Sequence, residues 1–356
     1  MPATESEMLW TALKLVAPGT PLREGIDRIL QAKMGALIVI ADFPEVIALC
    51  SGGFPLDVRF SPQRLSELAK MDGAIILASD ASRIVRANVH LVPDSSIPTS
   101  ETGTRHRTAE RVARQIAVPV VTVSEEMSVV SIYVDGSRRT LAAISRVLAR
   151  SDQALQILGR YKARLDHVTS SLSALEVEDL VTVRDVAEVL QRAEMVRRIA
   201  DEVEGYIVEL GTDGRLVQLQ LEELTGGVLE ELRLVCKDYF VVSSEIVLNR
   251  VLRNIGALDD EELLDLRTVA SVLNLPPDVE FDTTLAAKGH RLLAKIPRLS
   301  EDLGDRVVEH FGKLAKLLRA NTSDLIDIDG IGDVRARMIK DGLGRLAEAS
   351  ILERYS

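Results

Sequence analysis

The chain has 356 residues, and its 43 Lys and Arg against 54 Asp and Glu give a formal net charge of −11. At roughly 150 residues per domain, this length predicts two or three domains. Hydrophobic residues make up 46% and charged residues 27%, a composition typical of folded proteins that excludes wholesale disorder. The acidic balance excludes a globally basic surface of the kind that nucleic-acid binders often show.

Two cysteines, Cys50 and Cys236, are too few for a disulfide framework or for a zinc site made of cysteines. The N-terminal residues 1–10 lack the basic and apolar segments of a secretory signal peptide. No stretch reaches the roughly 18 apolar residues of a membrane helix, so no membrane partner is expected. The sequence therefore predicts a cytoplasmic protein of several domains.

The first part of the chain alternates helical patterns with short apolar runs. The helical patterns span residues 9–16, 22–34 and 62–70. The runs predict strands at residues 36–41, 46–50, 74–78, 84–91, 118–123 and 129–134. Interleaved strands and helices predict an α/β fold, with a mixed sheet in a three-layer domain over residues 1–148.

From residue 149 the pattern becomes helical. Apolar residues recur at three- and four-residue steps from Val186 to Ile207, which predicts one face of a long helix that ends at residues 211–214. Further helices are expected at residues 216–223, 228–237, 243–251 and 260–275. We therefore expect an all-α spine over residues 149–285 that acts as a spacer or scaffold.

Residues 286–356 contain a weak internal duplication. Residues 295–299 resemble residues 327–331 at an offset of 32, and a helical pattern precedes and follows each segment. Two helix–loop–helix units of this size cannot each bury a core alone, so we expect them to pack as a pair.

The second copy fits the helix-hairpin-helix pattern, in which glycines let backbone N–H groups approach a DNA phosphate. The expected DNA-binding residues are Gly330, Ile331, Gly332, Arg335, Arg337 and Lys340. The first copy has Pro297 and Leu299 where glycine is expected, so we expect it to be mainly structural. The alternative for the pair is a helical hairpin that only packs or oligomerises. Nearby aspartates soften the positive field, which predicts modest, salt-sensitive binding.

The strongest candidate for chemistry is residues 101–108 (Glu-Thr-Gly-Thr-Arg-His-Arg-Thr), which precede apolar residues at helical spacing. This segment predicts a glycine-containing loop that opens a helix. Free N–H groups and the positive end of the helix dipole favour an anion there. Arginines supply forked donors to phosphate oxygens, and Thr104 and Thr108 can add hydroxyl donors. We favour phosphate binding over the alternative, a solvated basic loop.

Two acidic positions are candidates for metal binding or proton transfer. Asp72 precedes the buried strand that starts at Ala74, where a carboxylate can hold a divalent metal or accept a proton from an attacking hydroxyl. Gly73 would let the backbone approach a flat ligand such as a base or ribose. Glu125 follows the strand at 118–123, and ligands gather at the carboxyl ends of strands in open α/β sheets. The alternatives are an ordinary Asp-Gly turn and a surface carboxylate.

Asp72-Gly73-Ala74, followed about 30 residues later by Gly103-Thr104-Arg105-His106-Arg107, resembles the paired signature of the diadenylate cyclase family. The whole chain is similar to family members that continue into a helical spine and a C-terminal helix-hairpin-helix pair. The resemblance implies condensation of two ATP molecules into cyclic di-AMP with release of two pyrophosphates. It also implies a homo-oligomer, an octamer, in which active sites of two subunits face each other.

The resemblance implies a role for each matching residue. The implied catalytic residues are Asp72, which activates the ribose 3′-hydroxyl, and Arg105 and His106, which stabilise the leaving charge. Asp72 and Glu125 are the implied contacts of a divalent metal, Mg²⁺ or Mn²⁺. The implied substrate-binding residues are Gly73, Ala74, Leu91, Thr104, Arg105, His106, Arg107, Thr108 and Ser124.

Two functions from different classes stay open. The first is a cyclase whose rate is changed by branched or damaged DNA bound through backbone contacts at the C-terminal pair. The second is a non-catalytic DNA-binding scaffold that senses a nucleotide. The resemblance further implies a recombination ATPase as a protein partner.

Overall fold

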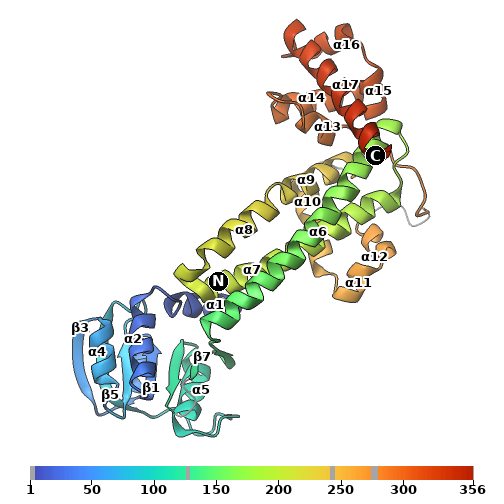
Figure 1. Ribbon diagram of the computed structural model, residues 1–356. Coiled ribbons are helices and arrows are strands. Elements are labelled where there is room, and N and C mark those ends of the chain that lie inside the picture. The colour runs from blue at the N-terminus through green and yellow to red at the C-terminus, as the bar shows by residue number, and fades with distance from the viewer. Residues whose placement is uncertain (1–4, 126–128, 241–244, 274–279, 356) are drawn as a thin grey trace. The chain divides into compact units, whose positions relative to one another are not determined.

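The computed structural model describes residues 5–125, 129–240, 245–273 and 280–355 (Figure 1). The chain divides into two compact units, which are described separately. The first unit comprises Met1–Gln153 and Val203–Leu219, and the second comprises Ala154–Glu202 and Gln220–Ser356. The boundary predicted at residue 148 lies inside helix α6 (Ile144–Glu178), and the predicted spine contributes residues to both units.

Within the described residues, the first unit is built on an eight-stranded sheet in the order β2-β5-β4-β1-β6-β7-β8, with β3 paired to β5. Strands β1 and β4 are parallel, and the other neighbours run antiparallel. The predicted mixed sheet is therefore confirmed. The strands are β1 (Ala36–Ile40), β2 (Cys50–Ser51), β3 (Phe54–Arg59), β4 (Ala74–Leu77), β5 (Arg83–Leu91), β6 (Val120–Ser124), β7 (Val129–Val134) and β8 (Ser137–Thr140).

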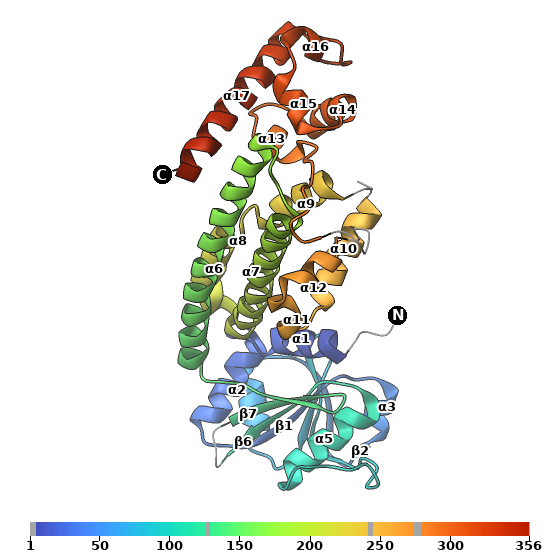
Figure 2. The same cartoon turned by 90° about the vertical axis from the view of Figure 1, so that its right-hand side faces the viewer.

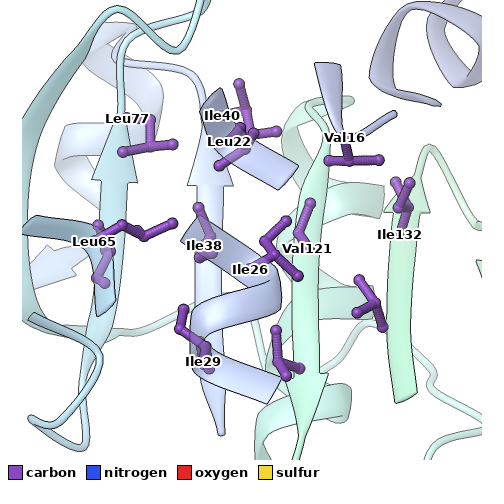
Figure 3. Close-up of a cluster of buried hydrophobic side chains, with 14 of the residues drawn as sticks. Val16, Leu22, Ile26, Ile29, Ile38, Ile40, Leu65, Leu77, Val121 and Ile132 are labelled. Atoms are coloured by element: carbon purple, nitrogen blue, oxygen red, sulfur yellow. The ribbon is translucent and has the colours of Figure 1, made fainter. Parts of the chain in front are cut away.

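Helices cover both faces of this sheet, which confirms the three layers (Figure 2). Successive residues of β1 face opposite cores, because side chains alternate along a strand: Ile38 and Ile40 join the first core, and Val39 joins the second. Figure 3 shows the first core, where α2 packs on the strands. The covering helices are α1 (Glu5–Leu15), α2 (Pro21–Gln31) and α4 (Pro62–Leu68) on that side, and α3 (Pro44–Ala48) and α5 (Thr104–Ile116) on the other.

One predicted strand is wrong, and two strands were not predicted. Residues 46–50 form most of α3 and only the start of β2, because Pro44 occupies the first turn and favours a helix. The missed strands β3 and β8 lie at sheet edges, and their residues are half-buried or exposed. An edge strand with little burial lacks the apolar pattern by which a strand is recognised in a sequence.

A helical turn from the predicted spine belongs to the first unit and packs against its N-terminal part. Helix α7 (Val183–Leu210) ends at the predicted position, and the short helix η1 (Gly211–Gly214) connects it to α8 (Arg215–Thr225). The backbone N–H of Thr212 donates to the carbonyl of Pro18 at 3.1 Å, and Arg139 of β8 pairs with Glu209. A Cβ at Gly211 would lie 2.3 Å from the same carbonyl, so this contact requires glycine.

The second unit contains helices only, apart from one isolated bridge between Thr182 and Thr284, in the part of it that the structure describes. The helix predicted at 260–275 is divided, because the Asp265 side chain caps a new helix there. Residues 243–244 and 274–275 of the predicted helices lie outside the described residues. Besides parts of α6, α7 and α8, the unit holds α9 (Val228–Tyr239), α10 (Glu245–Ala257), α11 (Asp260–Leu264), α12 (Leu266–Ser271), α13 (His290–Ala294), α14 (Glu301–Phe311), α15 (Leu314–Arg319), α16 (Thr322–Ile326) and α17 (Asp333–Tyr355). No helix among the described residues is long and apolar enough to cross a membrane.

The two segments of the predicted duplication have matching backbones. In the loop between α13 and α14, the N–H of Leu299 donates to the carbonyl of Ile296, and in the loop between α16 and α17, Ile331 donates to Ile328. The residue just before the donor has a positive φ in both loops, +66° at Arg298 and +87° at Gly330. The same loop conformation therefore recurs at the predicted offset, although one copy has arginine where the other has glycine.

The first of these loops is anchored by a buried arginine. Arg291 of α13 is 0% exposed, and its guanidinium lies 2.6 Å from a carboxylate oxygen of Glu176 on α6 and of Glu231 on α9. The carboxylate of Asp238 on α9 accepts the backbone N–H groups of Gly289, His290 and Arg291 at 2.7, 2.7 and 3.0 Å. These charge-assisted bonds satisfy the N-terminus of α13 and join it to the helices beneath.

Replacing this arginine is expected to loosen the C-terminal helices. In Arg291→Met, the buried carboxylate of Glu176 and the half-buried carboxylate of Glu231 lose their partner, which costs about 3–5 kcal/mol. Hydrogen exchange of the α13 and α14 amides measures the free energy of local opening. The matched control is Arg298→Met, which removes an exposed arginine seven positions along the chain. Equal protection in both variants would contradict the anchoring role.

Candidate active site

The sheet topology creates a pocket of about 630 Å³ at one edge of the first unit. At this end of the sheet the parallel strands β1 and β4 begin and the antiparallel strands β5 and β6 end. The pairing of Ala74 with Val89 and of Ala36 with Val123 brings these four strand ends together. The start of α5 completes the wall. The lining residues are Gly35, Ala36, Leu37, Met71, Asp72, Gly73, Ala74, Val89, His90, Leu91, Gly103, Thr104, Arg105, His106, Thr108, Ser124 and Glu125.

The first turn of α5 presents donors to this pocket. Gly103 is the N-cap and makes no side-chain cap, and Thr104, Arg105 and His106 follow it into the helix. The first N–H groups of a helix have no partner within the helix, and the dipole places partial positive charge beside them. The predicted anion site therefore has the expected local structure.

Arg105 is held by a glycine and a carboxylate. Its guanidinium lies 3.3 Å from Oδ1 of Asp72, on the loop before β4. A Cβ added at Gly35 would lie 2.1 Å from the guanidinium nitrogen, so the arginine occupies the space that a side chain at position 35 would fill. Asp72 itself is 97% exposed at the mouth of the pocket, where its carboxylate can reach a ligand from outside.

Gly73 is required for a reason that differs from the predicted one. A Cβ at Gly73 would lie 2.5 Å from backbone atoms of Asn88 on β5, which has a φ of +53°. The register of β4 and β5 shifts just beyond this point, between Ala74 and Ile76. The missing side chain therefore allows the close approach of a neighbouring strand; the approach of a ligand at Gly73, which lines the pocket, stays a prediction.

His106 is bound on its inner edge by the sheet. Its Nδ1 lies 2.9 Å from the hydroxyl of Tyr133 on β7 and 3.1 Å from that of Thr122 on β6. Burial lowers the pKa of His106; Glu101 opposes this shift, whereas Arg138 and Arg105 lower the pKa further. The imidazole is therefore biased toward its neutral form, and an anion in the pocket would raise its pKa.

The structure gathers most of the predicted site residues and separates one. Arg107 is exposed on the first turn of α5 and is not among the residues that line the pocket. The hydroxyl of Thr108 donates to the carbonyl of Thr104 at 2.9 Å, so its proton is already used within the helix. The other predicted catalytic, substrate and metal residues line the one pocket: Asp72, Gly73, Ala74, Leu91, Thr104, Arg105, His106, Ser124 and Glu125.

Several contributors were not predicted. Gly35 directly precedes a buried strand, and a glycine at that position could have been recognised in the sequence as a candidate. That Arg105 fills the space beside it could not be recognised, because this depends on the strand order of the sheet. His90 lines the pocket as the exposed position next to the end of β5. Tyr133 is almost fully buried beneath His106 and gave no signal beyond that of a core residue.

The donor set of the pocket fits a divalent cation such as Mg²⁺. Asp72 and Glu125 line the same pocket from different loops, and both residues are exposed. Magnesium is usually bound through one or two carboxylates together with phosphate oxygens of a substrate and water. Among the described residues, no group of three or more His, Cys, Asp and Glu forms a cage that could hold a metal by itself. The two carboxylates therefore suit a cation that arrives with a phosphorylated ligand.

The candidate DNA-binding residues lie in and after the loop between α16 and α17. Gly330 and Gly332 are exposed, whereas Ile331 is buried in the hairpin. Arg337 is exposed, and the exposed Arg335 donates to the carbonyl of Gly330 at 2.6 Å. Lys340 is half-buried, and its ammonium donates to the carbonyls of Leu318 and Ala320 at 2.9 and 2.6 Å. The lysine is thus committed to the end of α15.

Comparisons with known families agree with this arrangement. Residues 23–138, which include every residue that lines the pocket, match the family described as DisA bacterial checkpoint controller nucleotide-binding. Residues 141–281 match the DisA bacterial checkpoint controller linker region. The fold and pocket thus define a nucleotide-binding domain followed by a helical linker.

Full-length relatives extend this result to the whole chain. The DNA integrity scanning protein DisA of Frankia casuarinae is 55% identical over 345 residues, which cover 96% of each chain. That of Acidothermus cellulolyticus is 54% identical and covers 98% of this chain and 96% of its own. That of Kineococcus radiotolerans is 54% identical and covers 99% of both. The chain belongs to the DisA family.

The surroundings of His106 predict its titration. In Glu101→Gln, the carboxylate that raises the pKa of His106 is neutralised while Arg138 and Arg105 remain, so this pKa is expected to fall further. Because folding depresses the pKa of His106, its protonation weakens the folded state as the pH drops below the ordinary histidine value of about 6.5.

Histidine-selective NMR titration of the full chain measures this pKa, and the other histidines of the five serve as internal controls. A His106 pKa at or above about 6.5 in the protein without nucleotide would contradict the described environment.

Proposed function

We propose that the chain is a diadenylate cyclase, which condenses two ATP molecules into cyclic di-AMP and releases two pyrophosphates. Membership of the DisA family supports the activity. The observation that carries the proposal is one pocket that combines an uncapped helix N-terminus, Arg105 and His106 with an exposed carboxylate, Asp72, at its mouth. The helix N-terminus, Arg105 and His106 suit a triphosphate, and the carboxylate of Asp72 suits an incoming hydroxyl.

In this reaction the 3′-oxygen of one ATP attacks the α-phosphorus of the other. A bond forms from the 3′-oxygen to the α-phosphorus, the bond from the α-phosphorus to the pyrophosphate oxygen breaks, and the hydroxyl proton is lost. We assign Asp72 to receive that proton and Arg105 to balance the charge that develops on the pyrophosphate; both line the pocket, which supports these roles. Such transfers depend mainly on positioning and charge neutralisation. The described pocket supplies both.

Asp72 and Glu125 would hold the divalent cation, Mg²⁺ or Mn²⁺. When bound, such a cation polarises phosphate oxygens and lowers the pKa of a coordinated hydroxyl. Leu91 and Ala74 line the pocket and would supply apolar surface for the adenine. Ser124 adds a polar side chain on the wall beside Glu125.

The symmetric product requires two sites that face each other. One pocket of this kind binds one ATP, so each 3′-oxygen must reach the α-phosphorus held by another subunit. The exposure of Asp72 at the pocket mouth supports this arrangement, because its carboxylate is open to a nucleotide from outside. We place the pair about a two-fold axis, within an octamer as the family resemblance implies.

Replacing the carboxylate at the mouth tests the activity. Asp72→Asn is expected to lower cyclic di-AMP formation by at least about 100-fold, because a proton acceptor is lost from the reaction. Arg105 stays in the pocket, so ATP still binds. Mass spectrometry of the product formed from ATP with Mg²⁺ or Mn²⁺ measures the rate, and equilibrium binding of ATP measures affinity.

The matched control is Asp80→Asn, which changes an exposed aspartate that does not line the pocket. Full activity of Asp72→Asn would contradict the role of Asp72. Wild-type protein that binds ATP but forms no cyclic dinucleotide would instead favour the alternative function, a nucleotide-sensing DNA-binding scaffold.

We further propose that the loop between α16 and α17 binds the DNA backbone as a helix-hairpin-helix. Exposed glycines at positions 330 and 332 leave the backbone open at the start of α17, and Arg335 and Arg337 are exposed on the turns that follow. Contacts of this kind recognise phosphates and DNA shape more than base sequence, which suits branched DNA. Both modules lie on one chain, and we propose that DNA bound at this loop changes the cyclase rate.

Neutral substitutions of these arginines test the interface. Arg335→Gln and Arg337→Gln are each expected to weaken binding of a four-way DNA junction and to reduce the slope of log affinity against log salt by about one. Fluorescence anisotropy over a salt series measures both quantities. Arg298→Gln, in the matching loop of the first copy, is the control and is expected to leave binding unchanged. A loss in Arg298→Gln equal to that of the other two would assign the contact to both loops.

A further inference from the structure

A chain of hydrogen bonds connects His106 to residues outside the pocket. The hydroxyl of Tyr133 lies 2.9 Å from Nδ1 of His106 and donates to Oε1 of Glu101 at 2.9 Å. The same oxygen of Glu101 accepts from the guanidinium of Arg138 at 2.7 Å. This set, Tyr133, Glu101 and Arg138, is called the relay below. Its members come from β7, from the loop before α5 and from β8.

The proton count in the relay fixes the tautomer of His106. The phenol of Tyr133 has one proton, which it donates in a hydrogen bond to the carboxylate of Glu101. While Glu101 pairs with Arg138 it is ionised and has no proton to donate to the tyrosine oxygen. Toward His106 the tyrosine oxygen can therefore only accept. The proton between them must lie on Nδ1, and the neutral imidazole then has its free electron pair on Nε2.

Several features keep the relay in this state. Burial and the hydrogen bond to Glu101 raise the pKa of Tyr133, so its hydroxyl stays protonated. The guanidinium of Arg138 lies 5.9 Å from the centre of the Tyr133 ring, which adds a cation–π contact. Thr122 also lies beside Nδ1 and offers a second acceptor for the same proton. The direction of the bond between Tyr133 and His106 therefore follows from the bond between Tyr133 and Glu101.

The orientation of the imidazole then decides which nitrogen of His106 faces the pocket. Nδ1 faces the sheet strands β6 and β7, whereas His106 as a residue lines the pocket. The two ring nitrogens lie on different edges of the imidazole, so Nε2 is on the side away from the relay. On that side Nε2 can bind a proton and donate it in a hydrogen bond to a phosphate oxygen. An anionic ligand favours this protonation because it raises the pKa of the imidazole.

We infer that Tyr133, Glu101 and Arg138 are positioning residues that hold the proton of neutral His106 on Nδ1, so that Nε2 is the nitrogen that takes up a proton and donates it to the phosphates of the nucleotide. The inference rests on the proposed function only for the identity of the ligand. The relay residues do not line the pocket, so they act through His106. Arg139, the neighbour of Arg138 on β8, pairs with Glu209 and is outside the relay.

The tautomer is tested first, on the protein without nucleotide. Nitrogen chemical shifts of labelled histidine, assigned with His106→Gln, are expected to show Nδ1–H in the wild type. Tyr133→Phe removes the acceptor, so a population of the Nε2–H tautomer is expected to appear. An Nε2–H wild type would overturn the inference whether or not the protein makes cyclic di-AMP, so the two failures are distinguishable.

A pair of substitutions at Glu101 separates positioning from packing. Glu101→Gln keeps a carbonyl oxygen that can accept from Tyr133 and Arg138, so the Nδ1–H tautomer is expected to persist. In Glu101→Ala the tyrosine hydroxyl is released and can donate to His106, which is expected to shift the tautomer to Nε2–H. Identical nitrogen shifts in these two variants would contradict the relay.

Kinetics provides the second test. Tyr133→Phe is expected to lower kcat by about 10- to 100-fold, as for partners that orient metal-bound histidines, with a smaller change in KM for ATP. Arg139→Gln, on the adjacent strand β8, is the control and is expected to stay within about two-fold of the wild type, as surface substitutions generally do. A Tyr133→Phe enzyme with wild-type kcat and tautomer would overturn the inference.

Discussion

The candidate site depends on the register of the sheet. Ala36 pairs with Val123 and Ala74 pairs with Val89, so the starts of β1 and β4 meet the ends of β6 and β5 at one end of the sheet. A sheet of parallel strands alone would place only carboxyl ends there. Here the loop with Asp72 precedes its strand while Glu125 follows another, and both reach the same pocket. The charged groups gather because the sheet is mixed.

Much of the first unit could be predicted because its strands are buried on both faces. Continuous apolar runs such as residues 74–78 are typical of buried strands. The two motifs were visible as charged, glycine-containing segments, one just before that run and the other at the start of a helical pattern. Residues 46–50 show the limit of this argument, since a short apolar run is compatible with a buried helix as well as a strand. Local proline placement decided the outcome there.

The groups beneath the site could not be predicted for a different reason. Strand β8 is polar and lies at an edge, so no periodic signal marked it, and without β8 there is no way to place Arg138 beside Glu101. Tyr133 resembled an ordinary core residue. Gly73 was predicted to matter, but its close neighbour is Asn88 on the adjacent strand. Partners distant in sequence become visible only after the strand order is known.

Gly35 shows what such hidden partners mean for the comparison of sequences. A side chain at this position would leave the sheet intact, since what it meets is the movable end of Arg105. The guanidinium would be displaced while every letter of both signatures stayed the same. On the proposed role of Arg105, a homologue with intact signatures and a bulky residue ahead of its first strand would be a candidate pseudoenzyme, recognisable from one position that neither signature includes.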